Sequence, residues 1–64
     1  MTGMETLAAE KIKESRTEGV VSEVFQTRKE MTDFLTALLV GKTEMDLTVN
    51  AFKNGTSCVY LEVN

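Results

Sequence analysis

The residue best suited to chemistry in this chain is Cys58, the only cysteine among 64 residues. A cysteine becomes a nucleophile when a histidine, a basic neighbour or a helix N-terminus stabilises its thiolate. The sequence contains no histidine, and Cys58 lies in the run TSCVYLEVN without a basic neighbour. A half-buried structural thiol is therefore the better interpretation. General acid–base work would fall to carboxylates, lysines or Tyr60, and we expect the protein not to be an enzyme.

The sequence contains no recognisable motif for binding a cofactor or a metal ion. The four glycines are scattered, each at the end of a predicted element, and form no phosphate-binding loop. One thiol without a histidine cannot supply the usual ligands of structural zinc. Asp46, Glu62 and Glu44 offer oxygen ligands for a hard cation, but the solvated end of a sheet explains them more simply. The sequence predicts no cofactor and no metal.

Glu10, Glu14 and Glu18 are spaced by four residues and form an acidic line along the first predicted helix. Like charges at this spacing slightly destabilise a helix, so the line is a candidate binding site for a basic partner or a divalent cation. The alternative is a solvated face whose repulsion is softened by basic neighbours. Those neighbours are Lys11, Lys13 and Arg16.

Charge and composition narrow the class of protein. A net charge of −3 and an isoelectric point near 4.8 argue against a general nucleic-acid binder, which needs a basic face. Residues 1–15 carry charges throughout, so we expect neither a signal peptide nor a membrane span. A lone cysteine without an export signal fits the reducing cytoplasm. With 42% apolar and 27% charged residues, we expect residues 1–64 to form a single small domain.

Helical periodicity is clearest over residues 28–40, where apolar side chains form one broad face that ends at Gly41. A shorter N-terminal helix with a narrow apolar stripe is predicted to begin at Thr2, to fray from Ser15 and to stop at Gly19.

The run GVVSEVFQ between these helices fits either a strand over 20–26 or part of one long helix over 20–40. Thr27 and Glu30 form a capping box that opens a new helix. The capping box favours the strand.

Over residues 45–63, two runs of strand-forming residues flank Asn54-Gly55, which predicts a C-terminal β-hairpin. A two-residue turn would place the aliphatic side chains of the two strands on opposite faces. A three-residue loop with Gly55 in the left-handed conformation instead pairs Val49 with Val59 and gathers these side chains on one face. We favour the three-residue loop, although it also sets Asp46 opposite Glu62, a mildly unfavourable like-charge pair.

The second face of the hairpin mixes aromatic and small polar side chains, as subunit interfaces do. Its residues are Thr48, Asn50, Phe52, Cys58 and Tyr60. Either the N-terminal helix or a second copy of the chain must cover this face. The final strand also lacks the lysine or proline that would protect a sheet edge, so its edge is a second candidate interface.

The sequence thus predicts an α+β fold: an N-terminal helix, a strand over 20–26, a helix over 28–40 and the hairpin. We expect a non-enzymatic protein–protein interaction or regulatory accessory module that acts as a homodimer through its hairpin and binds a protein partner. The alternative is a small nucleic-acid-binding regulator that uses a dimer-generated basic patch. The patch would comprise Lys11, Lys13, Arg16, Arg28 and Lys29.

Overall fold

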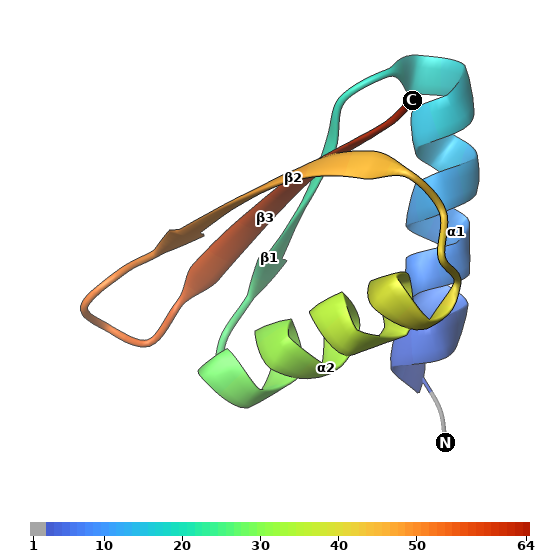
Figure 1. Ribbon diagram of the computed structural model, residues 1–64. Coiled ribbons are helices and arrows are strands. Elements are labelled where there is room, and N and C mark those ends of the chain that lie inside the picture. Colours follow the sequence, from blue (N-terminus) through green and yellow to red (C-terminus); the bar gives the residue numbers. More distant parts are fainter. Residues whose placement is uncertain (1–2) are drawn as a thin grey trace.

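The chain has an α+β fold. Within residues 3–64, which the computed structural model describes, two helices lie on one side of a three-stranded antiparallel sheet (Figure 1). In chain order the elements are α1 Gly3–Glu18, β1 Val21–Phe25, α2 Arg28–Val40, β2 Met45–Ala51 and β3 Ser57–Val63. This confirms the predicted fold class, including the strand before α2. The alternative of one long helix over 20–40 is wrong.

The end of α1 follows from a glycine. Gly19 has φ of 92°, a left-handed conformation that favours glycine, and its N–H donates to the Ser15 carbonyl at 2.8 Å. The predicted fraying from Ser15 is wrong, because Ser15 is buried and the helix runs on to Glu18. The expected N-cap at Thr2 lies outside the described residues.

The predicted cap of α2 is confirmed. The Thr27 hydroxyl accepts a hydrogen bond from the Glu30 N–H at 3.2 Å. The helix ends at Val40, directly before Gly41 as expected, but Gly41 keeps a right-handed backbone and Lys42 takes the left-handed conformation with φ of 57°.

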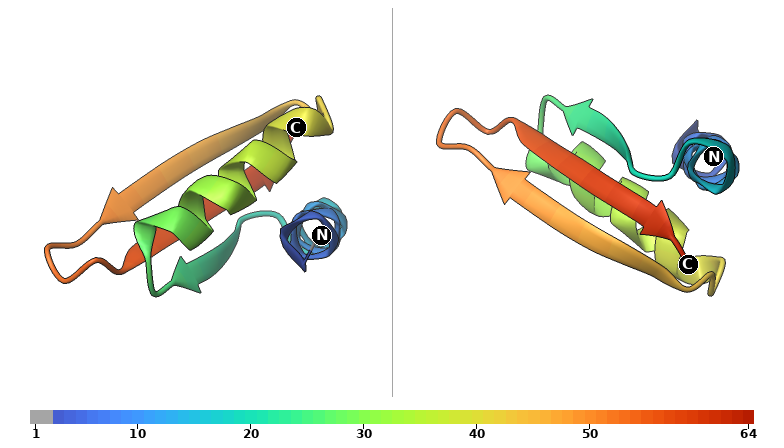
Figure 2. Two further views of the ribbon diagram at one scale, coloured as in Figure 1. Left: turned by 90° about the horizontal axis from the view of Figure 1, so that it is seen from below. Right: turned by 90° about the horizontal axis from the view of Figure 1, so that it is seen from above.

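The order of strands in the sheet is β1-β3-β2. Both outer strands are antiparallel to β3, so β1 and β2 run parallel to each other with β3 between them. The connection from β1 through α2 to β2 is a right-handed crossover, as expected for parallel strands (Figure 2). The prediction that the final strand has a free edge is wrong, because β3 is paired on both sides. The free edges belong to β1 and β2.

The register of the hairpin is the one that the three-residue loop predicts. Val49 lies opposite Val59, and Asp46 lies opposite Glu62. The Phe52 N–H donates to the Thr56 carbonyl at 2.9 Å, which closes the loop over 53–55. Gly55 has φ of 92°, as the bulged loop requires.

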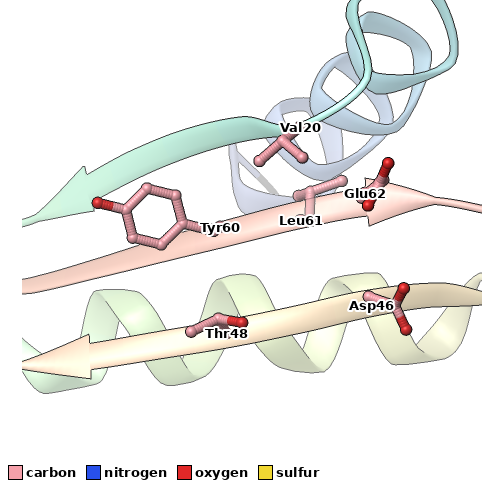
Figure 3. A pocket seen from close by; sticks show the side chains of 6 residues that line it. All are labelled: Val20, Asp46, Thr48, Tyr60, Leu61 and Glu62. Carbon is pink, nitrogen blue, oxygen red and sulfur yellow. The ribbon is translucent and has the colours of Figure 1, made fainter.

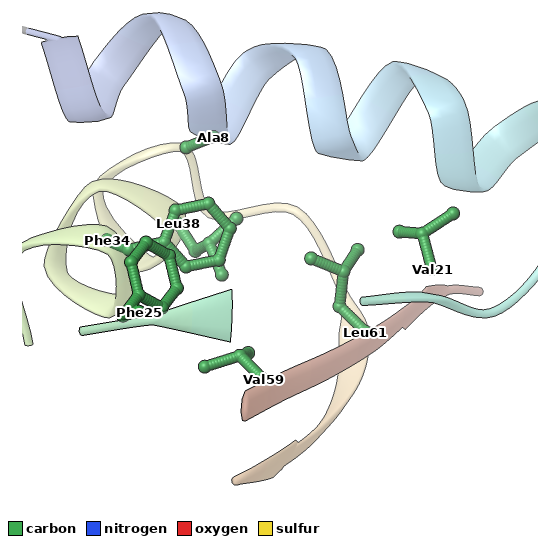
Figure 4. Close-up of a cluster of buried hydrophobic side chains, with 7 residues drawn as sticks. All are labelled: Ala8, Val21, Phe25, Phe34, Leu38, Val59 and Leu61. Atoms are coloured by element: carbon green, nitrogen blue, oxygen red, sulfur yellow. The ribbon is translucent and has the colours of Figure 1, made fainter. Parts of the chain in front are cut away.

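Seven buried apolar side chains form the core, and none of them comes from β2 (Figure 4). They are Ala8, Val21, Phe25, Phe34, Leu38, Val59 and Leu61. The rings of Phe25 and Phe34 lie 5.0 Å apart and tilted, a favourable aromatic arrangement. On the same side of the sheet Leu47 of β2 is only half-buried, and Val49 is 40% exposed. The helices therefore cover β1 and β3 but leave β2 partly bare.

Two buried serines differ in their hydrogen bonding. The Ser15 hydroxyl donates to the Gly19 carbonyl and accepts from the Val63 N–H at 2.9 Å, which joins α1 to the end of β3. The Ser57 hydroxyl is fully buried and has no hydrogen-bond partner among the described residues. A buried polar group without a partner lowers stability.

The same substitution at these serines should have opposite effects. Ser57→Ala should raise the free energy of unfolding by about 1 kcal/mol, because it removes an unpartnered hydroxyl, and Ser15→Ala should lower it by a similar amount, because it leaves the Val63 N–H unsatisfied. Urea unfolding followed by circular dichroism measures both. A loss of stability in Ser57→Ala would contradict the assignment of an unpartnered hydroxyl.

Candidate protein-interaction surface

The side of the sheet opposite the helices carries no cover from residues 3–64. Seen from above, the three strands lie in front of α2, and α1 appears end-on beside β1 (Figure 2). We call this side the open face. Because side chains alternate along a strand, the register of the sheet identifies the residues on the open face. They are Ser22 and Val24 of β1, Asp46, Thr48 and Asn50 of β2, and Cys58, Tyr60 and Glu62 of β3.

The structure places four of the five predicted interface residues, all except Phe52, together on the open face. Tyr60 pairs with Thr48, and Cys58 pairs with Asn50. Phe52 lies one residue beyond β2, and its side chain is exposed. The alternative that α1 covers this face is wrong, because α1 packs with α2 on the opposite side of the sheet (Figure 2).

The sequence missed the contribution of β1 to the open face. Val24 is 53% exposed and pairs with Cys58, and Ser22 pairs with Tyr60. Val20, just before β1, is also exposed. The hairpin register could be predicted from the spacing of nearby residues. The pairing of β1 with β3 joins residues far apart in the chain, so no local sequence pattern predicts it.

A shallow hollow of about 90 Å³ lies on the open face (Figure 3). Figure 3 shows Val20, Thr48 and Tyr60 projecting from three neighbouring segments around it. Sites for cofactors and drug-sized ligands are roughly 300 Å³ or larger. The hollow is therefore smaller than such sites and is comparable in size to one amino-acid side chain.

One end of the open face is acidic. Asp46 and Glu62 lie directly opposite each other, and no ion pair to either is present in the described part of the chain. Residues 3–64 contain no group of three or more His, Cys, Asp or Glu side chains placed to hold a metal ion. The hard-cation reading of Asp46, Glu62 and Glu44 gains no geometric support from this arrangement.

Cys58 and Tyr60 are neighbours on the open face, two positions apart along β3. Hydrogen bonding with the Cys58 thiol, then its charge and a small loss of solvation, raises the pKa of Tyr60 above its ordinary value. Cys58 is a free, half-buried thiol, and Tyr60 is the only tyrosine in a chain without tryptophan. Tyr60 is therefore a native spectroscopic reporter of the open face.

The acidic line on α1 is partly engaged within the chain. Glu14 forms an ion pair with Lys11 at 3.3 Å, and Lys11 also reaches Glu23 of β1 at 3.1 Å. Burial lowers the pKa of Lys11, but the hydrogen bonds and charges of Glu23 and Glu14 outweigh burial and leave that pKa raised. Glu10 and Glu18 are exposed. The line is therefore not a continuous free surface.

The two edges of the sheet differ in their protection. At the β1 edge the Lys11 ammonium donates to the Ser22 carbonyl at 3.1 Å, so α1 covers a backbone group that would otherwise be free. Both panels of Figure 2 place α1 on the β1 side of the sheet and away from β2. The β2 sequence, MDLTVNA, contains no lysine or proline. The β2 edge thus lacks the lysine and proline that usually oppose pairing with another strand, and its one charge is Asp46 near one end.

Comparison with known proteins gives no further guide: no family model, no curated protein and no solved structure matches the chain. None of the helices within residues 3–64 combines the length and the apolar character needed to cross a bilayer.

Removing the thiol should change the titration of Tyr60. Cys58→Ala should lower the pKa of Tyr60 toward its ordinary value, because the group that disfavours the tyrosinate is gone. Ultraviolet absorbance of the tyrosinate, recorded while the pH is raised, measures this pKa. Ser22→Ala changes the β1 residue that pairs with Tyr60 and serves as the control. An equal shift in the control would show that Cys58 is not the cause.

Proposed function

We propose that this chain is a non-enzymatic protein-interaction module that acts as a homodimer through its C-terminal hairpin. The observation that carries the proposal is the state of β2: its edge is unprotected, and its apolar side chains are only half covered by the helices. A strand of this kind is a template for pairing with another chain. A second copy of the same chain always supplies such a strand.

The size of the core supports self-association. A chain this short buries only about 60% of the surface that its unfolded form exposes, so small folds often rely on disulfides, metals or oligomers for stability. A disulfide within the chain is impossible with one cysteine. Burial of Leu47 and Val49 against a second copy would extend the apolar core into the region that the helices leave bare.

The open face supports a role in binding a further protein. It combines exposed Val24 and Tyr60, with exposed Phe52 just beyond β2, and small polar side chains, a mixture typical of protein interfaces. If two copies join edge to edge, their open faces lie on the same side and form one larger surface. A regulatory or accessory protein that bridges two partner molecules would use such a surface.

The arrangement of basic residues favours a protein partner over a nucleic acid. Lys11 is bound by two carboxylates, and Lys29 forms an ion pair with Asp33 at 3.1 Å. Two of the five residues of the basic patch are thus neutralised locally. Binding to nucleic acid weakens steeply with salt. Once a ligand is identified, a salt titration of its binding therefore distinguishes a nucleic-acid-binding protein from a protein-binding one.

Sedimentation equilibrium across a wide range of concentrations tests the dimer. We expect a reversible transition from the 7.1 kDa chain to twice that mass. Val49→Lys should shift the transition to higher concentration by tenfold or more, because an inward-pointing charge on an edge strand opposes pairing. Such a shift corresponds to at least about 1.4 kcal/mol of association free energy.

Val40→Lys is the matched control. Val40 is 72% exposed at the end of α2 and is not part of the hairpin, so its replacement should leave the dimer intact. Circular dichroism must show that both variants keep the fold. A wild-type chain that stays monomeric at every concentration would overturn the proposal, as would a dimer that Val40→Lys dissociates and Val49→Lys does not.

A further inference from the structure

We propose that the two copies join through β2, antiparallel and centred on Thr48, so that the two sheets become one continuous six-stranded sheet. This inference rests on the homodimer proposed above. It adds the strand, its direction and its register, none of which follows from dimer formation alone.

The choice of β2 follows from the contrast between the two edges. The β1 edge is partly protected by α1, because Lys11 donates to the outward Ser22 carbonyl and is held there by Glu23. No hydrogen bond within residues 3–64 reaches the outer side of β2. A fourth strand at β1 would have to displace the Lys11 bond to Ser22, whereas at β2 it would find every outward backbone group open.

Hydrogen bonds at the two ends of the hairpin show which backbone groups of β2 point outward. Phe52 donates to Thr56 at 2.9 Å, and Asn64 donates to Glu44 at 3.2 Å. Bonded and non-bonded pairs alternate along an antiparallel ladder, so Asp46, Thr48 and Asn50 bond to β3. The residues between them direct their N–H and C=O groups to the free edge. These residues are Met45, Leu47, Val49 and Ala51.

A two-fold axis beside Thr48 satisfies all these outward groups at once. Thr48 is the middle residue of Met45–Ala51, so only this register pairs the strand over its full length. Leu47 of one copy then bonds with Val49 of the partner subunit, and Met45 bonds with Ala51 of the partner subunit. Any other register leaves outward groups of β2 without partners in the second copy.

Side-chain chemistry fits the same register on both faces. On the helix side, the half-covered Leu47 and Val49 meet each other across the junction, which buries apolar surface. On the open face, Asp46 meets Asn50 of the partner subunit, a neutral hydrogen-bonding partner for the only charge on the strand. A shift that centres the pair on Asp46 would set two carboxylates against each other, which is unfavourable.

Disulfide trapping tests the register directly. In a Cys58→Ser background each introduced thiol is the only one in the chain. Thr48→Cys should form a covalent dimer under mild oxidation, because the two copies of residue 48 face each other in a non-hydrogen-bonded pair with Cβ atoms about 5 Å apart. Asn50→Cys should not, because its two copies lie about 13 Å apart, four residues along the ladder.

A mixture of two variants completes the test. Asp46→Cys and Asn50→Cys should each stay unlinked alone but link to one another when mixed, since residues 46 and 50 face each other across the junction. Residues 46, 48 and 50 are exposed, so these changes should not unfold the chain. Non-reducing electrophoresis reads the products, and sedimentation of the Cys58→Ser parent reports whether a dimer is present.

Failure of this inference and failure of the proposed dimer give different results. A dimeric parent in which Thr48→Cys stays unlinked, or in which Asn50→Cys links with itself, overturns the register and leaves the dimer standing. A monomeric parent overturns both. Linkage in Thr48→Cys and in the mixture, without linkage in the two single variants, supports the inference.

Discussion

The pairing of β3 on both sides is the constraint on which the rest of the structure depends. This strand bonds to β2 through the hairpin and to β1 across the length of the chain. Its Val59 and Leu61 are almost completely buried in the core, and β3 contacts both helices. Because β3 lies in the middle, the outer strands β1 and β2 form the two free edges of the sheet.

The helices then divide these edges unequally. α1 and α2 pack on each other and on the side of the sheet that carries the core, and α1 lies along the β1 side, where Lys11 joins it to Ser22 and Glu23. The β2 strand contributes no fully buried apolar side chain to this core. Within residues 3–64 the two helices cover neither the whole of β2 nor the second face of the sheet, so the hairpin keeps an open face and an open edge.

Much of this architecture could be predicted from the sequence, because it rests on short-range signals. The capping box at Thr27 identified the start of α2, and the spacing around Gly55 gave the correct hairpin register. Both features depend on residues a few positions apart, where backbone conformation and side-chain alternation determine the result.

What the sequence did not reveal depends on long-range contacts. The position of β3 between β1 and β2, the packing of α1 beside α2, and the contribution of Val24 to the open face all follow from pairing between distant segments. The residues expected at the interface do lie together, but they share the face with β1. The edge expected on the last strand lies instead on β2.

Amide hydrogen exchange as a function of protein concentration tests the central claim most directly, since it observes the β2 edge itself. The Leu47 and Val49 amides point outward, so they should exchange quickly in the monomer and slowly once the dimer forms. The Thr48 and Asn50 amides, bonded to β3, should be protected in both states, and the Val24 amide on the other edge should exchange quickly in both. Slow exchange of Leu47 and Val49 that appears only as the dimer forms would bear out the account. Fast exchange of these two amides in a fully formed dimer would contradict it.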